Sequence, residues 1–481
     1  MTITTPVLPI AGPDKTRSRT AWAIAITGAA QFMGALDNLV VTFALPVIRR
    51  SLHAGLAGLE WTVNAYTLSF AVLLLTGAAL GDRFGRRRMF IFGLVLFTVS
   101  SAAAALSPSV GVLIAARAFQ GAGGALLIPL SLTLLSASVP ADKRNAALGI
   151  WGAIGGLAVA VGPLVGGSVV EGLSWHWIFW LNVPLGLVLA PLARVRLDES
   201  FGDGRRLDVV GVALASAGLF GLVFGLVRGG SVGWSSGEVI VGFVAGAILL
   251  AAFVAWERVA PAPMLPLGLF AHRGFSVVNG VALFMSFGMF GSIFFLAQFL
   301  QTVQHLSPLT AGLRTLPWTG MPILVAPLAG LFVERVGGRA LIATGLALQA
   351  IGLAWIAIVI APGTPYTEVV PAFVLSGIGM SLFFVPVASV VLSSVPRSAE
   401  GVASGTNNAV RELGGVLGIS VLGAVFASFG GYATRATYVA GLLPALRVGT
   451  GIVAAGALLA IALPRARRTV ATNAEVGLEA A

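Results

Sequence analysis

Four ionisable residues fall deep inside long apolar stretches of this sequence. They are Asp37, Arg117, Arg411 and Glu412, and the pattern of apolar runs places no other acid, Lys or Arg as far inside a predicted helix. A charge at the centre of a bilayer costs about 2.5–3.5 kcal/mol on insertion scales. Each of these side chains is therefore expected to be paired or to serve a function.

Proton exchange is the chemistry that this set of residues favours. A carboxyl group in a partly hydrated cavity can be ionised or neutral, depending on which side admits water. An Arg stays charged throughout and can stabilise the ionised carboxylate. The alternative is that the four charges form two structural salt bridges that fix helix packing.

Glu412 shares a predicted helix face with other polar residues. Asn408, Arg411, Glu412 and Gly415 follow one another at i, i+3, i+4 and i+7, and Asn407 precedes them. Residues at this spacing lie on one side of a helix. A polar face inside a membrane is expected to line a cavity or another helix.

The elements that must position these residues are membrane-spanning helices. Of the 481 residues, 57% are hydrophobic and only 10% are charged, with a mean hydropathy of +0.96. A soluble domain carries about 25% charged residues, so a water-soluble fold is excluded. Apolar runs of about 20 residues, each able to span a bilayer, predict helices near 21–46, 60–80, 89–106, 110–138, 145–170, 176–193, 207–227, 237–257, 275–301, 309–332, 340–361, 367–394, 401–428 and 446–463.

Lys and Arg are distributed unevenly between the two sides of this predicted bundle. If residues 1–20 lie inside, the inner segments carry 21 Lys and Arg and the outer segments carry six, while Arg117 and Arg411 lie within helices. The positive-inside rule then predicts that both termini are cytoplasmic. The chain is predicted to be an all-α, multi-pass protein of the inner (plasma) membrane.

A dense charged segment, GDRFGRRR at 81–88, separates the second and third predicted helices. A weaker copy, GLFVERVGGR at 330–339, separates the tenth and eleventh. Two copies of a six-helix unit would place the second loop after the eighth helix, so two helices are inserted between the halves. The predicted organisation is a tail at 1–20, a six-helix bundle at 21–193, linkers with two inserted helices at 194–270, a second six-helix bundle at 271–464 and a tail at 465–481.

Five motifs occur in order along the chain. They are LDNLVVTFALP at 36–46, GDRFGRRR, RAFQGAGGALLIP from Arg117, GPLVGG at 162–167 and WHWIFWLNVPLG at 175–186. With them the sequence resembles the major facilitator superfamily, and within it the fourteen-helix drug:proton antiporter branch. The resemblance spans residues 20–464 and implies a major facilitator fold of two six-helix bundles plus two extra helices. Glu412 departs from the family pattern, which often has Gln at that position.

The two charged loops are predicted to act as conformational latches. An acid where a helix meets the cytoplasm can pair with basic groups in one conformation only, and breaking that pair accompanies the conformational change. The alternative is that the Arg residues only anchor the topology and contact anionic lipid. The residues assigned to the latches are Asp82, Arg83, Gly85, Arg86, Glu334 and Arg335.

The fifth predicted helix carries Gly162, Pro163, Gly166 and Gly167. Small residues allow close helix packing, and Pro adds a kink. The resemblance implies that this helix seals against the other half and limits leak, as an antiporter requires. The two interpretations are compatible.

A substrate-binding surface is predicted from amides and a Phe stripe. Phe residues recur every three or four positions in the ninth predicted helix, which suits either a lipid-facing surface or a flat apolar wall that tolerates many compounds. The candidate substrate contacts are Gln31, Asn38, Asn64, Phe287, Phe290, Phe294, Gln298, Asn407 and Asn408.

These features predict a proton-coupled secondary active exporter (antiporter) of lipophilic, cationic drugs that works by alternating access. The expected partners are a small-molecule substrate, protons and membrane lipid, with no nucleic acid and no obligate protein partner. The chain has no Cys, its four His lack metal-ligand spacing, and no GxxxxGK[ST] loop occurs, so neither metal, cofactor nor ATP is expected. The alternatives are an exporter dedicated to one natural product or lipid and, more remotely, a non-transporting membrane sensor or an intramembrane enzyme.

Overall fold

The computed structural model describes residues 13–140, 142–202, 207–396 and 399–464, apart from the side chains of 13–18, 145 and 334. Within these residues every regular element is a helix, and fourteen segments are long and apolar enough to cross a membrane. The predictions of an all-α fold and of about fourteen spans are confirmed. The placement of the two termini relative to the membrane stays a prediction.

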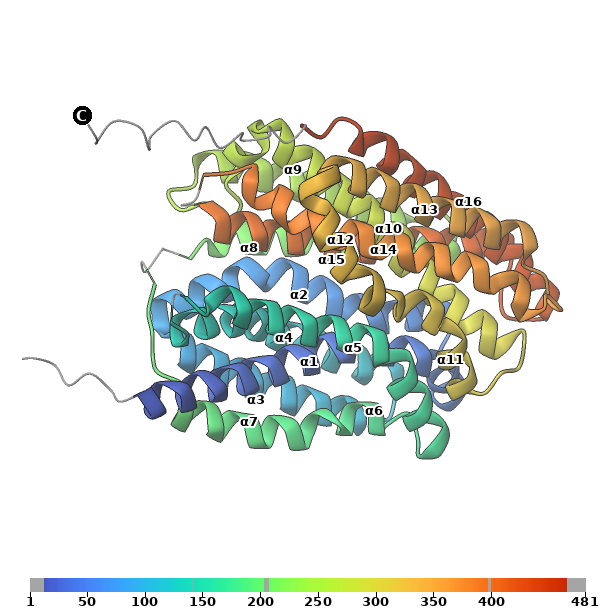
Figure 1. Ribbon diagram of the computed structural model, residues 1–481. Coiled ribbons are helices and arrows are strands. Elements are labelled where there is room, and N and C mark those ends of the chain that lie inside the picture. Colours follow the sequence, from blue (N-terminus) through green and yellow to red (C-terminus); the bar gives the residue numbers. More distant parts are fainter. Residues whose placement is uncertain (1–12, 141, 203–206, 397–398, 465–481) are drawn as a thin grey trace, which may run out of the picture.

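The N-terminal half forms one group of packed helices, in the lower part of Figure 1. Apolar runs longer than the hydrocarbon core account for its long helices, because such a helix can tilt or continue past the bilayer. Its elements are α1 (Pro13–Ser51), α2 (Leu56–Phe84), α3 (Arg86–Ala105), α4 (Val110–Ser138), α5 (Arg144–Gly172), and a last span made of α6 (Trp177–Trp180) and α7 (Asn182–Arg196).

The C-terminal half lies above it in Figure 1. Its second span is divided at Gly320 into two helices. The elements of this half are α10 (Arg273–Thr302), α11 (Pro308–Thr319), α12 (Met321–Val336), α13 (Gly338–Val359), α14 (Tyr366–Ser393), α15 (Glu400–Phe429) and α16 (Arg435–Ala460), preceded by the short helix η1 (Leu267–Ala271).

The inserted pair, α8 (Val209–Val232) and α9 (Gly237–Val259), packs against both halves. A buried apolar cluster joins Val223 of α8 to Val72 of α2 and Val416 of α15. The indole of Trp61 on α2 also lies 5.2 Å from the ring of Phe220 on α8, measured between ring centroids. The inserted helices therefore cover one seam between the halves.

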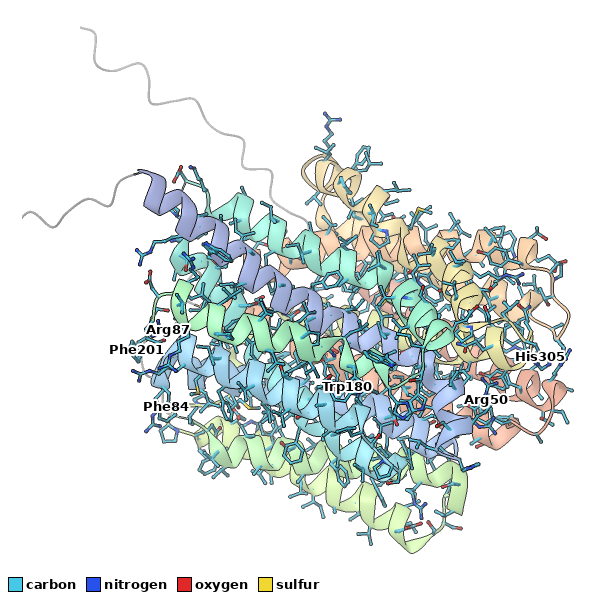
Figure 2. The ribbon with its side chains drawn as sticks, turned by 90° about the horizontal axis from the view of Figure 1, so that it is seen from below. Arg50, Phe84, Arg87, Trp180, Phe201 and His305 are labelled. Atoms are coloured by element: carbon cyan, nitrogen blue, oxygen red, sulfur yellow. The ribbon has the colours of Figure 1, made fainter. Side chains whose placement is uncertain are left out.

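The two ends of the bundle are marked by different residues. Figure 2 shows Phe84, Arg87 and Phe201 together at one end and Arg50 and His305 at the other. We call the first end the 81–88 face and the second the opposite face.

The two charged loops make the same kind of turn on the 81–88 face. Gly85 joins α2 to α3 with φ of 103°, and Gly337 joins α12 to α13 with φ of 87°. Only Gly adopts this backbone conformation without strain. The weak sequence repeat thus corresponds to a structural one.

The structure corrects the inventory of charges inside helices. Glu60 lies within α2 and is 1% exposed, and Glu257 lies within α9 and is 4% exposed. Arg447, expected in an outer segment, lies twelve positions after Arg435, the first residue of α16. Asp37 and Glu412 are therefore not the only acids inside helices, because α2 begins four residues before Glu60 and α9 continues two residues past Glu257. Arg447 lies inside a helix because α16 begins earlier than the run predicted at 446–463.

Candidate functional site

Asp37 on α1 is the centre of a buried polar network. Its Oδ2 accepts a hydrogen bond from Nη1 of Arg117 on α4, with which it forms a salt bridge. Its Oδ1 accepts hydrogen bonds from Gln120 Nε2 at 2.8 Å and from Asn182 Nδ2 at 2.9 Å. Asp37 is 2% exposed and Arg117 is 0% exposed, so two helices, α4 and α7, supply three donors to one carboxylate inside the protein.

The Arg117 guanidinium makes further contacts besides its salt bridge to Asp37. Its Nε donates to the carbonyl oxygen of Thr62 at 3.1 Å, and its Nη1 donates to Gln120 Oε1 at 2.8 Å. The guanidinium carbon lies 4.2 Å from the centroid of the Tyr66 ring. A guanidinium over an aromatic face gains cation–π stabilisation.

Three members of this network were missing from the predicted site residues. Gln120 and Asn182 bind Asp37 directly, and Ser101 Oγ accepts from both of them at 3.1 and 3.0 Å. A signal for two of them was present in the sequence. Gln120 lies one turn after Arg117 in RAFQGAGG, and Asn182 belongs to WLNVPLG.

The geometry limits how a proton can reach the Asp37 carboxylate. All three groups that contact its oxygens are hydrogen-bond donors. A protonated carboxyl needs an acceptor for its own proton. Proton uptake at Asp37 therefore requires one of these donors to turn away, which links protonation to the arrangement of α1, α4 and α7.

The C-terminal half places Arg411 and Glu412 side by side on α15. Arg411 Nη1 donates to Asn408 Oδ1 at 3.0 Å, and its guanidinium carbon lies 4.7 Å from the centroid of the Phe384 ring. Glu412 Oε2 is buried and has no hydrogen-bond partner within the described residues.

The predicted substrate amides do not form one surface. Asn64 is fully buried, and its Nδ2 donates to Ser420 Oγ at 2.9 Å, so it links α2 to α15. Asn407 Nδ2 donates to Asn279 Oδ1 at 3.1 Å and so links α15 to α10. Gln31 packs against Gly155 of α5, and Asn38 is half-buried beside Asp37 in the sequence.

The Phe stripe packs within the C-terminal half. Phe287 and Phe294 on α10 are 4% and 1% exposed, so neither presents its ring to lipid or to an open cavity. Phe290 lies against Gly415 of α15 and is half-buried. Gln298 accepts a hydrogen bond from the Tyr432 hydroxyl at 2.6 Å and donates its own to a backbone carbonyl.

The Gly-rich helix α5 contacts both its own half and the other. Gly162 and Gly166 lie against Leu39 and Val40 of α1, close enough that a side chain at either Gly would collide with α1. Gly167 lies equally close to the backbone of Pro308, at the start of α11 in the C-terminal half.

On the same side, Pro163 contacts Gly312 of α11 through its backbone carbonyl. The structure therefore brings the GPLVGG segment into the interface between halves.

The first charged loop binds the linker that follows α7. Asp82 Oδ1 accepts from Nε and Nη2 of Arg86, both at 2.8 Å, one turn away across the α2–α3 turn. The Arg87 N–H donates to Glu199 Oε1 at 2.8 Å, and the N–H of Gly202 donates to the carbonyl oxygen of Asp82 at 3.1 Å. Glu199 is a further participant that the sequence did not indicate.

The remaining latch residues have fewer contacts. The Arg83 guanidinium carbon lies 5.3 Å from the centroid of the neighbouring Phe84 ring. Arg335 is exposed at the end of α12. The side chain of Glu334 lies outside the described part of the structure.

The hydrogen bonds that join the two halves, within the described residues, lie toward the opposite face. Besides Asn64 to Ser420, they run from Gln301 Nε2 to the carbonyl oxygen of Phe43 at 2.9 Å, from the Leu309 N–H to Glu171 Oε2 at 3.0 Å and from Thr319 to Ala160 at 3.4 Å. On the 81–88 face the described ion pairs stay within the N-terminal half and its linker.

The inserted pair carries a carboxyl cluster where α8 begins. Asp208 caps α8 by accepting from the Gly211 N–H at 2.8 Å, and it accepts from the Trp256 indole at 2.7 Å. Burial by itself would raise the pKa of Asp208. Its hydrogen bonds outweigh that effect and hold the pKa below its ordinary value, with donors on Gly211, Trp256 and Met264.

Comparison with known proteins identifies the fold and the class of protein. The family model described as "Major Facilitator Superfamily" matches residues 27–256, 199–419 and 278–478. A bacterial homologue of the human lysosomal transporter Spinster, solved in an inward-facing and unoccupied conformation, superposes with a TM-score of 0.65 at 16% identity, over 92% of this chain and 96% of that one.

Curated relatives are similar over most of their length. The tetracenomycin C resistance and export protein of Streptomyces glaucescens is 37% identical, over 82% of this chain and 74% of the relative. Multidrug resistance protein Stp of Mycobacterium tuberculosis is 36% identical, over 84% and 75%. The puromycin resistance protein pur8 of Streptomyces alboniger is 34% identical, over 86% and 82%.

The chain belongs to the Major Facilitator Superfamily. It is a multi-pass membrane transport protein of the cell membrane, and the prediction of a transporter rather than an enzyme is confirmed.

Proposed function

We propose that this chain is a proton-coupled exporter of lipophilic, cationic drugs, and that it works by alternating access. The observation that carries the proposal is the fully buried Asp37 carboxylate, held only by donors from α4 and α7. Its partners include Arg117, which keeps its charge at every physiological pH. Proton binding to Asp37 would break this arrangement and compete with a cationic substrate for the same negative charge.

Alternating access is supported by the distribution of contacts between halves. The hydrogen bonds that join the halves lie toward the opposite face, so that face is closed while the 81–88 face lacks comparable links in the described residues. The Spinster homologue that shares this fold was solved inward-facing. Rocking one half against the other would break the Asn64–Ser420 and Gln301–Phe43 bonds and open the opposite face.

The names of the relatives support a drug as the cargo. They include a multidrug resistance protein and proteins of resistance to, or export of, single antibiotics. The single-compound names also support a second candidate, an exporter dedicated to one natural product. A screen of cationic dyes and neutral antibiotics separates the two, because a dedicated exporter would accumulate one chemical class only.

The test is transport by the purified protein in proteoliposomes with an imposed pH gradient. We expect uphill accumulation of a cationic dye that stops when a protonophore collapses the gradient. One elementary charge falling through 100 mV releases about 2.3 kcal/mol, enough to support a gradient of roughly fiftyfold. Accumulation that survives the protonophore would contradict proton coupling.

A further inference from the structure

Glu60 is a buried acid that the Asp37 network does not use. It lies on α2 one turn before Asn64, and it is 1% exposed. Its Oε1 has no hydrogen-bond partner, and within the described residues no Lys, Arg or His forms a salt bridge with it. An unpartnered carboxylate buried in a protein is costly, so a ligand or a proton is expected to satisfy it.

Glu60 lines a cavity of about 280 Å³ near the opposite face. The cavity lies between α2, α8 and α15, at the seam that the inserted helices cover. Gly55 and Ser231 at its rim are exposed, whereas Glu60 is buried, so the carboxyl lies deep in the cavity.

Small and aromatic residues form most of the wall. Gly423 and Ala427 of α15 leave the space open, and a methyl group on Gly423 would overlap Glu60 Oε1. The rings of Phe426 and Tyr432 add an aromatic surface, with centroids 5.5 Å apart. Glu60 is the only acid among the residues that line this cavity.

The cationic groups around the cavity are already engaged. Arg228 lines it but pairs with Glu238 at 2.8 Å. The guanidinium carbon of Arg49 lies 4.0 Å from the centroid of the Tyr432 ring. The Tyr432 hydroxyl, on a residue that also lines the cavity, donates to Gln298 at 2.6 Å. None of the three provides Glu60 with a hydrogen bond or an ion pair.

We propose that Glu60 and this cavity form a second cation-binding site, separate from Asp37, that takes a small organic ammonium ion. Glu60 is the one acid in a wall that is mostly apolar and aromatic, and the Arg228 in that wall is paired with Glu238, so the site suits a soft, weakly hydrated cation. A divalent metal ion requires six or more oxygen ligands, or a set of His and carboxylate ligands, which this wall lacks. The inference extends the proposed function, because the ammonium ion would be cargo held near the exit after it leaves the Asp37 region.

The test measures binding of benzyltrimethylammonium to the purified full-length protein in nanodiscs by titration calorimetry. The measurement is made in the Asp37→Asn background, so that Asp37 contributes no charge. We expect this protein to bind the ion, and we expect addition of Glu60→Gln to weaken binding on the order of 30-fold or more, as for removal of one partner of a buried charge pair.

Glu368→Gln is the matched control, because it removes an exposed acid at the start of α14 that is not among the residues lining the cavity. It is expected to leave affinity unchanged. Equal affinity with and without Glu60, absence of binding in the Asp37→Asn protein, or an equal loss in Glu368→Gln would each overturn the proposal. These results are independent of uphill transport, so failure of proton coupling would be seen separately.

A measurement on the wild-type protein tests the site without depending on the folding of a variant. Dicyclohexylcarbodiimide labels carboxyl groups in apolar surroundings, and peptide mass spectrometry locates the label. Benzyltrimethylammonium is expected to slow labelling of Glu60 several-fold and to leave labelling of Glu257 unchanged. Equal rates at Glu60 with and without the ion would contradict the site.

Discussion

Each half of this transporter carries an acid and an Arg within the membrane, but the two pairs are built differently. Asp37 and Arg117 come from separate helices and bind each other, and both carboxylate oxygens of Asp37 are occupied. Arg411 and Glu412 are neighbours on α15, and Arg411 reaches Asn408 while Glu412 Oε2 has no partner. The N-terminal pair therefore joins two helices, and a proton on Asp37 would disturb its hydrogen bonds, whereas a proton on the Glu412 carboxyl would break no hydrogen bond of Oε2.

Loss of Arg117 is expected to have the largest effect on stability. Arg117→Leu would leave Asp37 buried with an uncompensated charge, which costs about 3–5 kcal/mol of unfolding free energy. Thermal unfolding in detergent measures the loss.

Two further variants test whether the loss of stability comes from the stranded Asp37 charge. Arg411→Leu should cost distinctly less, because Arg411 makes one hydrogen bond and is not the partner of a buried acid. Adding Asp37→Asn to Arg117→Leu should restore part of the stability, since no charge is then stranded. Equal losses for Arg117→Leu and Arg411→Leu would show that the two halves do not differ as described.

Asp82→Asn tests the charged loop and is expected to slow transport several-fold, with expression and substrate binding retained. The neutral amide weakens the bond to Arg86, and with it a contact between α2 and α3 that would change during the cycle. Initial rates in proteoliposomes measure the effect. Asp198→Asn is the control, because the ion pair of Asp198 with Arg19 on the same face is solvent-exposed and contributes little to stability. Normal turnover in Asp82→Asn would leave the charged loop with a topological role only.

Asp208 offers a third type of carboxyl, at the water-facing end of an inserted helix. Asp208→Ala removes the α8 cap and should cost about 1 kcal/mol at pH 7. Because the folded pKa of Asp208 is lowered, its contribution is complete above the unfolded pKa of about 3.9 and is lost as pH falls through the folded pKa. Thermal unfolding of both proteins from pH 7 down to pH 3 should show the difference shrinking below about pH 4; a constant difference would exclude the ionised carboxylate as its source.

The smallest effect on stability is expected from Glu412→Gln. Since Glu412 Oε2 makes no hydrogen bond, the change should stay within about 0.5 kcal/mol, as for a substitution that breaks no contact. We expect transport to persist with a shifted pH dependence or a narrower substrate range. An unchanged pH profile and substrate range would make Glu412 a structural neighbour of Arg411.

The sequence predicted the fold well because spans and topology depend on composition and length alone. Apolar runs located all fourteen spans. The division into two bundles with an inserted pair stays a prediction from the repeat of the charged loop. The ends of helices were less predictable. Glu60 is the first residue of the helix predicted at 60–80, whereas α2 begins four residues earlier at Leu56, so a residue expected at the membrane boundary lies buried inside a helix.

The charged residues of the candidate site were predictable, because charge inside a membrane helix is rare. Asp37 and Arg117 were predicted by their cost in a membrane, and the structure brings them into contact. For helix faces without charged residues, the sequence did not show which face packs against a neighbouring helix. That face depends on how each helix is rotated about its own axis in the bundle. Phe294 and Asn64 therefore lie in packing contacts, although their spacing also suited a binding wall.

The central claim is that Asp37 exchanges the driving proton, and the isosteric variant Asp37→Asn tests it most directly. Asn retains the shape and polarity of Asp but cannot bind and release a proton. Purified Asp37→Asn in proteoliposomes is measured for downhill exchange of a cationic dye and for uphill accumulation under an imposed pH gradient. We predict that downhill exchange is retained and that uphill accumulation is lost; accumulation at the wild-type rate would contradict the account and would make Glu412 the leading proton site.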